Sequence, residues 1–314
     1  MDQFIQFENQ TLALKLIEKA LLFKEKPLLN RENGKGKRIG LIFLNPSLRT
    51  RVSTQIAASN LGMECIVLNM DKEGWALEME DGAVMNKNKV EHIKDAAAVL
   101  GSYFDILAVR SFPSLTNKQE DTEDYVIKQF IKYSGIPIVS LESAVRHPLQ
   151  SLADMITIRE QSGDRKKPKV VLTWAPHIKA IPHAVANSFA EWVLGCDHDL
   201  TIAHPEGYEL NPTFTKDANI EYDQAKALKD ADFVYVKNWS SFNDYGRIIH
   251  VDKSWMLTEE KLRNSPSAKV MHCLPVRRNL ELSDEILDNS RSLVQEQAKN
   301  RIYAAQAVLD ELMK

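Results

Sequence analysis

Short apolar runs and amphipathic stretches alternate along the chain from about residue 37 onward. Apolar runs of four to eight residues are typical of buried strands, and the longer amphipathic stretches between them are typical of helices. The predicted strands are Arg38–Leu44, Cys65–Asn69, Phe104–Val109, Ile136–Ser140, Lys169–Trp174, Asp199–Ala203, Phe233–Val236 and Val270–Leu274. This alternation favours parallel sheets with crossover helices, and therefore an α/β fold.

The predicted helices lie between and after these strands: Ser47–Leu61, Val90–Leu100, Glu123–Tyr133, Leu152–Gln161, Pro182–Leu194, Tyr222–Leu228 and Gln297–Met313. A length of 314 residues favours two domains. We expect two doubly wound parallel-sheet domains with a ligand cleft between them. Their expected ranges are 1–146 and 147–290, with a C-terminal helix, 291–314, that packs back on the first domain.

Composition and charge narrow the class of protein. Lys and Arg number 40 against 43 Asp and Glu, which leaves a net charge of −3 and no global positive field for nucleic acid. The three cysteines form no CxxC pair, and no stretch has the composition of a signal or membrane segment. We therefore expect a cytoplasmic protein that contacts neither membrane nor nucleic acid. No metal-ligand spacing, Gly-x-Gly-x-x-Gly or Walker pattern is present, so we expect no metal and no cofactor.

The segment Asn45–Arg51 stands where a predicted strand gives way to a helix. Free backbone N–H groups at a helix start make an anion site, to which Ser47 and Thr50 add hydroxyl donors. Arg49 and Arg51 supply planar guanidinium groups suited to phosphate oxygens. The alternative is an ordinary serine N-cap followed by two solvated arginines.

Two further places could contribute to the same site. Arg110 follows a predicted strand, and the carboxyl ends of parallel strands face the ligand crevice. Its alternative is a surface arginine. His147 and Gln150, near the start of a helix, could together hold a carbonyl and an NH2 group, although a lone histidine is more often structural.

The segment His272–Pro275 closes the last predicted strand. A nucleophilic Cys273–His272 dyad is disfavoured because adjacent residues on a strand point to opposite faces. The proline instead indicates a turned backbone whose carbonyl groups point into the cleft.

Taken together, the segment Ser47–Arg51, the sequence HPLQ at 147–150 with Ala153-Asp154, the sequence HCLP at 272–275, and Asn300-Arg301 resemble the aspartate/ornithine carbamoyltransferase family. The resemblance implies carbamoyl phosphate as a ligand and a homotrimer with shared active sites. It also implies a cis Leu274–Pro275 peptide. The residues that would bind carbamoyl phosphate are Ser47, Leu48, Arg49, Thr50, Arg110, His147, Gln150, Cys273, Leu274 and Arg301. Among them Arg49, Arg110, His147 and Arg301 would be catalytic.

Within the family, the chain resembles the branch that acts on N-acylated ornithine. Leu48, Glu73-Gly74-Trp75 and Val276-Arg277-Arg278 carry this resemblance, while the Asp-x-x-x-Ser-Met-Gly loop of plain ornithine enzymes is missing. Trp75 would then reach the neighbouring subunit's carbamoyl phosphate site. Glu142 and His177 would hold the amino-acid portion of the substrate, and Lys237 and Arg277 would meet its carboxylates. The alternatives are ordinary packing for Trp75 and surface salt bridges for Lys237 and Arg277.

The residue at position 90, here Val90, indicates whether the acyl group of the substrate is succinyl or acetyl. Enzymes resembling the succinyl type have proline there and acetyl enzymes have glutamate, and an uncharged valine avoids repelling a succinyl carboxylate. The implied reaction is carbamoyl transfer to N-succinyl-L-ornithine, giving N-succinyl-L-citrulline and phosphate in arginine biosynthesis. The alternatives are N-acetyl-L-ornithine as substrate and a noncatalytic anion-binding homologue. Putrescine is disfavoured because a diamine offers Lys237 and Arg277 no carboxylate.

Overall fold

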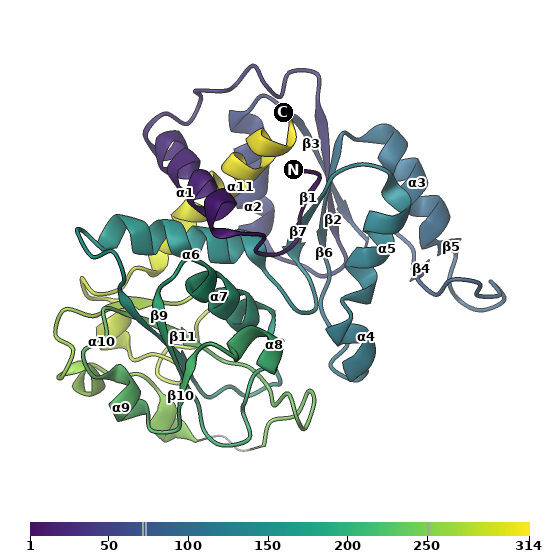
Figure 1. Ribbon diagram of the computed structural model, residues 1–314. Helices are drawn as coiled ribbons and strands as arrows, with labels where there is room; N and C mark the ends of the chain where they lie inside the picture. The colour runs from purple at the N-terminus through teal and green to yellow at the C-terminus, as the bar shows by residue number, and fades with distance from the viewer. Residues whose placement is uncertain (71, 73, 250–251) are drawn as a thin grey trace. The chain divides into compact units, whose positions relative to one another are not determined.

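The computed structural model describes residues 1–70, 72, 74–249 and 252–314, and it divides into two compact units. Unit 1 consists of residues 1–6, 18–149 and 301–314, and unit 2 consists of residues 7–17 and 150–300. Within the described ranges, each unit is built on a five-stranded parallel sheet (Figure 1). The predicted α/β class with two domains is confirmed. The last helix, α11 (Val294–Leu312), is divided between the units at Asn300 and Arg301.

The sheet of unit 1 has a doubly wound strand order. Its spatial order is β1 (Gln3–Phe4), β7 (Ile138–Glu142), β6 (Ile106–Arg110), β2 (Arg38–Phe43) and β3 (Glu64–Asn69). The chain runs from β2 outward to β3 and then crosses back to β6 on the other side of β2. The carboxyl ends of β2 and β6 therefore form a topological switch point, the place where open α/β sheets bind ligands.

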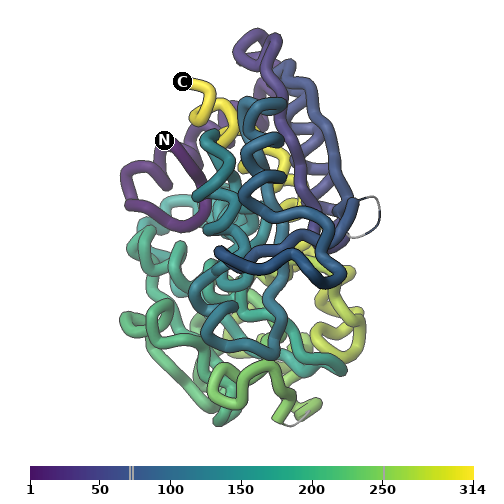
Figure 2. The backbone as a smooth tube through the Cα atoms, turned by 90° about the vertical axis from the view of Figure 1, so that its right-hand side faces the viewer, coloured from purple at the N-terminus to yellow at the C-terminus, as the bar shows by residue number. Residues whose placement is uncertain are grey.

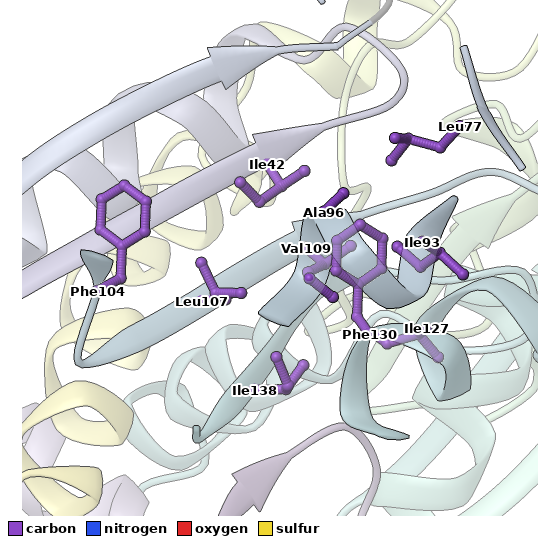
Figure 3. Packing of buried hydrophobic residues seen from close by; sticks show 11 residues of the cluster. Ile42, Leu77, Ile93, Ala96, Phe104, Leu107, Val109, Ile127, Phe130 and Ile138 are labelled. Atoms are coloured by element: carbon purple, nitrogen blue, oxygen red, sulfur yellow. The ribbon is translucent and has the colours of Figure 1, made fainter. Parts of the chain in front are cut away.

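Helices α3 (Ile93–Tyr103) and α5 (Tyr125–Ser134) cover one face of this sheet (Figure 1). Apolar side chains from the two helices meet those of β2, β6 and β7 in a buried cluster, with Phe130 between the helix and the sheet (Figure 3). Helix α2 (Leu48–Asn60) lies beside the C-terminal part of α11, where Asn60 donates to Gln306 Oε1 at 3.0 Å. Burial of these apolar faces stabilises the sheet whose carboxyl edge carries the candidate residues.

A short parallel pair, β4 (Leu77–Glu78) with β5 (Glu91–His92), brackets the loop that contains Val90. Helix α3 begins at Ile93, three residues later than predicted, because residues 91–92 pair as a strand. His92 then caps the helix by accepting from the Lys94 N–H. The short α4 (Lys118–Thr122) precedes α5.

The sheet of unit 2 repeats the arrangement. Its order is β10 (Asn219–Glu221), β9 (Asp199–Ala203), β8 (Lys169–Trp174), β11 (Phe233–Lys237) and β12 (Lys269–Met271). The switch point lies between the carboxyl ends of β8 and β11. The helices associated with this unit are α6 (Pro148–Gln161), α7 (Ala184–Gly195), α8 (Pro212–Thr215), α9 (Gln224–Leu228) and α10 (Asp284–Leu287), with 3₁₀ turns at Lys253–Trp255 and Glu260–Leu262.

The sequence interpretation missed some elements and misplaced some boundaries. Helix α1 (Gln10–Glu25) had not been predicted, and the strand expected at Val270–Leu274 ends at Met271. The two chain ends both belong to unit 1 and lie near each other in both views (Figures 1 and 2). Among the described helices, none combines the length and apolarity needed to cross a bilayer.

Candidate active site

The start of α2 follows the carboxyl end of β2 directly. Ser47 is at the N-cap position with extended backbone, yet its side chain makes no capping hydrogen bond. Ser47 is thus at the N-cap position of the alternative interpretation, but its hydroxyl is not used as a cap. The first turn of α2 contains no acidic residue, so its exposed N–H groups and the positive end of the helix dipole are not compensated by a carboxylate. This helix start can accept an anion.

Arg110 is the last residue of β6 and lies opposite Phe43 of β2. It is only 6% exposed, so the surface-arginine alternative is wrong. Its Nη1 donates to the carbonyl oxygens of Asn45 (3.0 Å) and Pro46 (2.6 Å), and its Nη2 donates to Glu142 Oε2 (2.9 Å). One guanidinium thus fixes the turn that leads into α2 and pairs with the carboxylate at the end of β7.

Several polar atoms of unit 1 are buried but unsatisfied. The Nε atoms of Arg49 and Arg110 and the Nδ1 atom of His147 have no hydrogen-bond partner within the described part of the chain. A buried polar group without a partner costs about 1–3 kcal/mol, and such groups in native proteins often meet a ligand. Two of these three belong to cations, which indicates an anionic ligand.

Arg301, at the point where α11 enters unit 1, links the start of α2 to His147. Its Nη2 hydrogen-bonds Thr50 Oγ1 and lies 3.5 Å from His147 Nε2. Burial lowers the pKa of His147 well below its ordinary value of 6.5, and the charges of Arg301 and Arg110 lower it further. The Nε2 atom lies 3.8 Å from Glu142 Oε2, but a neutral imidazole forms no ion pair with it. His147 therefore offers a neutral ring with one N–H donor.

This lowered pKa predicts a pH-dependent stability. Between the folded-state pKa of His147 and about 6.5, the unfolded chain binds a proton that the folded protein does not. The free energy of unfolding should therefore fall as pH drops below about 6.5, by up to about 1.4 kcal/mol per pH unit from this residue. Urea unfolding at pH 7.5 and 5.5 should show a smaller pH dependence for His147→Gln than for wild type. Equal dependence in both proteins would contradict a neutral, buried His147.

In unit 2, Lys237 is the last residue of β11 and lies opposite Trp174 of β8, at the switch point. It is 7% exposed, so the surface salt-bridge alternative is wrong for this lysine. Its Nζ donates to Asn238 Oδ1 (2.8 Å) and to the Asn238 carbonyl oxygen (3.2 Å). Within the described part of the chain, these hydrogen-bond acceptors are both neutral, so the lysine is suited to a carboxylate ligand.

Arg277 and His177 come together at the carboxyl end of the same sheet. The Nε of Arg277 donates to His177 Nε2 at 3.0 Å, and burial lowers the pKa of His177. Arg277 is exposed, and among residues 1–70, 72, 74–249 and 252–314 its side chain has this contact and no recorded salt bridge. An exposed guanidinium beside a neutral imidazole is suited to a carboxylate ligand.

Glu281 was missed by the sequence interpretation and organises the segment around Leu274. One carboxylate oxygen accepts from His272 Nε2 (2.9 Å) and the other from the Arg277 backbone N–H (3.2 Å). Burial alone would raise the pKa of Glu281, but the hydrogen bond from His272 and the nearby charge of Lys237 lower it overall. In the sequence, the position of Glu281 four residues after Arg277 was the one local hint that the two residues contact each other.

His272 uses both ring nitrogens, because its Nδ1 accepts from the Leu274 N–H at 2.9 Å. A Cys273–His272 dyad is thereby excluded, although the reason given from sequence was wrong, since these residues lie beyond β12. The Leu274–Pro275 peptide is cis, as the resemblance implied.

The remaining candidate residues differ in exposure. Gln150 is buried, and its Nε2 donates to Asp154 Oδ1 at 2.7 Å. Trp75 is 52% exposed, so core packing is excluded, and its Nε1 donates to Glu91 Oε2 at 2.8 Å. Leu48 and Val90 are exposed. Glu73, which helped to carry the resemblance, lies outside the described residues.

Comparison with known proteins agrees with this geometry. Residues 4–160 match the family model described as the carbamoyl-P binding domain of aspartate/ornithine carbamoyltransferase. Residues 182–312 match the model of the Asp/Orn binding domain. The chain therefore belongs to the aspartate/ornithine carbamoyltransferase family and is a carbamoyltransferase enzyme.

Two relatives in sequence and one solved structure are similar to this chain over nearly its whole length. The chain is 47% identical to N-succinylornithine carbamoyltransferase of Bacteroides fragilis, over 90% of this chain and 89% of the relative. It is 33% identical to N-acetylornithine carbamoyltransferase of Xanthomonas campestris, over 95% and 93% of the two chains. A solved structure of N-acetyl-L-ornithine transcarbamylase, with one glutamate mutated to valine, is complexed with carbamyl phosphate and N-succinyl-L-norvaline. It is 32% identical, with a TM-score of 0.95 over 99% of this chain and all of that one.

Proposed function

We propose that this enzyme transfers the carbamoyl group of carbamoyl phosphate to the side-chain amine of N-succinyl-L-ornithine. The observation that carries the proposal is the convergence of the helix start at Ser47 with Arg110 at the switch point of unit 1. The 47% identity to an N-succinylornithine carbamoyltransferase supports the choice of acceptor. The homotrimer with shared sites and the cytoplasmic location remain predictions.

The phosphate would be bound by the start of α2 together with Arg49 and Arg110. The residues proposed for carbamoyl phosphate are Ser47, Leu48, Arg49, Thr50, Arg110, His147, Gln150, Cys273, Leu274 and Arg301, with Trp75 acting on a neighbouring subunit. Cations at fixed positions stabilise the charge that grows on the departing phosphate, and they need no rearrangement during the reaction. His147 and Arg301 would polarise the carbamoyl oxygen.

In the reaction, the amine nitrogen forms a bond to the carbamoyl carbon, and the bond from that carbon to the phosphate oxygen breaks. The phosphate leaves with the electron pair. An alkylammonium with an ordinary pKa near 10.4 must lose a proton first, at a cost of about 4–5 kcal/mol at pH 7. A second proton leaves the nitrogen after attack, and the departing phosphate can accept one of the two. The main contribution of the protein is therefore positioning and electrostatic stabilisation.

The amino-acid portion would be bound by residues from the strand ends. An acylated α-nitrogen is neutral, so N-succinylornithine presents its terminal amine and two carboxylates. Lys237 and Arg277 would meet the carboxylates, and His177 and Glu142 would hold the rest of the amino-acid portion. The buried charge of Lys237 supports this assignment, because a buried ammonium without a carboxylate partner is costly unless a ligand supplies one.

Val90 would select the succinyl group. Its side chain is 67% exposed on the loop between β4 and β5, where it can contact a bound molecule. We propose that it occupies the position of the glutamate whose replacement by valine accompanies N-succinyl-L-norvaline in the solved relative. A carboxylate there would repel the succinyl carboxylate, whereas valine does not. N-acetylornithine remains the second candidate because acetyl-type enzymes match the whole chain.

Val90→Glu is therefore expected to lower kcat/KM for N-succinylornithine by about tenfold or more while N-acetylornithine loses less. The measurement is ureido-product formation from carbamoyl phosphate with ornithine, N-acetylornithine and N-succinylornithine. Val84→Glu is the matched control, since Val84 is an exposed valine of the same loop, and it should change neither acylated substrate more than about twofold. Wild-type preference for N-acetylornithine would overturn the succinyl assignment, and binding without product would favour the noncatalytic homologue.

A further inference from the structure

Asp124 immediately precedes α5 and has a left-handed backbone conformation, with φ 57° and ψ 42°. Aspartate tolerates this region better than most residues, but the conformation still costs about 1 kcal/mol or more. The side chain makes no capping hydrogen bond to α5, the usual role of an aspartate at this position. The carboxylate is used elsewhere.

Both carboxylate oxygens contact the segment after β7. Oδ2 accepts from the Ser143 hydroxyl at 2.7 Å, and Oδ1 accepts from the Ala144 backbone N–H at 3.0 Å. Burial raises the pKa of this carboxyl, and the hydrogen bonds from Ser143 and Ala144 oppose that shift. The bonds therefore favour the ionised form, which accepts at both oxygens.

The contacted segment is a tight turn. The Ser143 N–H donates to the Arg146 carbonyl oxygen at 2.8 Å, and the Arg146 N–H donates to Ser143 Oγ at 3.2 Å. The turn stands between Glu142, which pairs with Arg110, and His147. It thus sets the separation of these two side chains, whose nearest atoms, Oε2 and Nε2, lie 3.8 Å apart.

We infer that Asp124 is a positioning residue for carbamoyl transfer: it clamps the Ser143–Arg146 turn and so fixes His147 against Arg301 and Glu142. This inference rests on the proposed function. The recorded hydrogen bonds of the Asp124 carboxylate reach Ser143 and Ala144, so it would act through the turn. A displacement of about 1 Å in a catalytic group can cost about a hundredfold in rate, so a loosened turn should be visible in kcat.

Asp124→Asn is the test, because the amide is isosteric with the carboxylate but has only one acceptor oxygen. We expect kcat to fall about tenfold or more at a temperature well below the melting transition. The KM for the N-acylornithine substrate should change less than kcat, because Lys237 and Arg277, which would meet its carboxylates, belong to unit 2, whereas the clamped turn belongs to unit 1. Ser143→Ala removes the hydroxyl that bonds Asp124 and should reproduce the fall in kcat. If Asp124→Asn does not fold, the kcat of Ser143→Ala tests the positioning role instead.

Asp121→Asn is the matched control. Asp121 is also a buried aspartate of the same region, and it holds the neighbouring loop through the Ser114 N–H, the Ser114 hydroxyl and the Leu115 N–H. These bonds reach residues 114 and 115 and not the Ser143–Arg146 turn, so loosening them should lower the melting temperature and reduce kcat clearly less than Asp124→Asn does.

The outcomes separate the two proposals. A wild-type enzyme that makes no ureido product would overturn the proposed function itself. An active wild type with unchanged kcat in Asp124→Asn and Ser143→Ala would overturn the positioning role alone. An equal loss of kcat in Asp121→Asn would also overturn it, because the effect would then reflect general destabilisation of unit 1.

Discussion

Arg110→Met should lower kcat by at least about a hundredfold and destabilise the protein by about 3–5 kcal/mol. The turnover loss follows from removing a buried cation that both binds phosphate and holds the Asn45 and Pro46 carbonyl groups before the helix start. The stability loss follows because the buried Glu142 would lose the guanidinium that lies 2.9 Å from its carboxylate and compensates its charge. Steady-state kinetics and urea unfolding measure the two effects.

A double variant separates turnover from stability. Arg110→Met with Glu142→Leu removes both charges, so much of the lost stability should return while turnover stays low. Arg38→Met is the matched control: Arg38 pairs with Glu64 at 3.3 Å at the other end of the sheet, but both side chains are exposed. Its effect should be below about 1 kcal/mol. Near-normal kcat in Arg110→Met would remove Arg110 from the active site.

Arg49→Ala should lower kcat/KM for carbamoyl phosphate by about tenfold to a hundredfold with little change in melting temperature. One charge-assisted contact to a buried anion is worth about 1.5–3 kcal/mol. The guanidinium has a buried Nε without a partner in the described ranges, so removing it breaks few contacts of the ligand-free protein. Initial-rate kinetics at varied carbamoyl phosphate give the fold-change.

Arg51→Ala is the control for that prediction. Arg51 lies two residues further along α2, is exposed, and its Nη1 lies 3.4 Å from Asn69 Oδ1. Its loss should change kcat/KM by less than about threefold. Equal effects at positions 49 and 51 would mean that nonspecific positive charge, rather than the placement of Arg49, attracts the anion.

Several strands of both sheets could be predicted from sequence because both of their faces are buried. Lys169–Trp174 and Asp199–Ala203 have the predicted bounds, and Arg110 and Lys237 end their strands at the switch points. A continuous apolar run in a parallel sheet is a strong local signal, and a charged residue at its carboxyl end is easy to recognise.

Other features depend on contacts between residues distant in sequence. The run Val270–Leu274 is apolar except for His272, and the strand β12 ends at Met271 because His272 leaves the sheet to bond Glu281, nine residues further along the chain. Asp124 fell inside the predicted helix Glu123–Tyr133, and its bond to Ser143 could not be predicted because it forms only when α5 packs beside β7. Two-residue strands such as β4 and β5 are too short for any periodicity to appear.

The most direct test is a crystal structure with carbamoyl phosphate and N-succinyl-L-norvaline, which lacks the reacting amine. We predict phosphate oxygens within hydrogen-bond distance of the backbone N–H groups at the start of α2 and of the Arg49 and Arg110 guanidinium groups, and ligand carboxylates on Lys237 and Arg277. A phosphate bound away from the carboxyl ends of β2 and β6 would contradict the proposed carbamoyl transfer site.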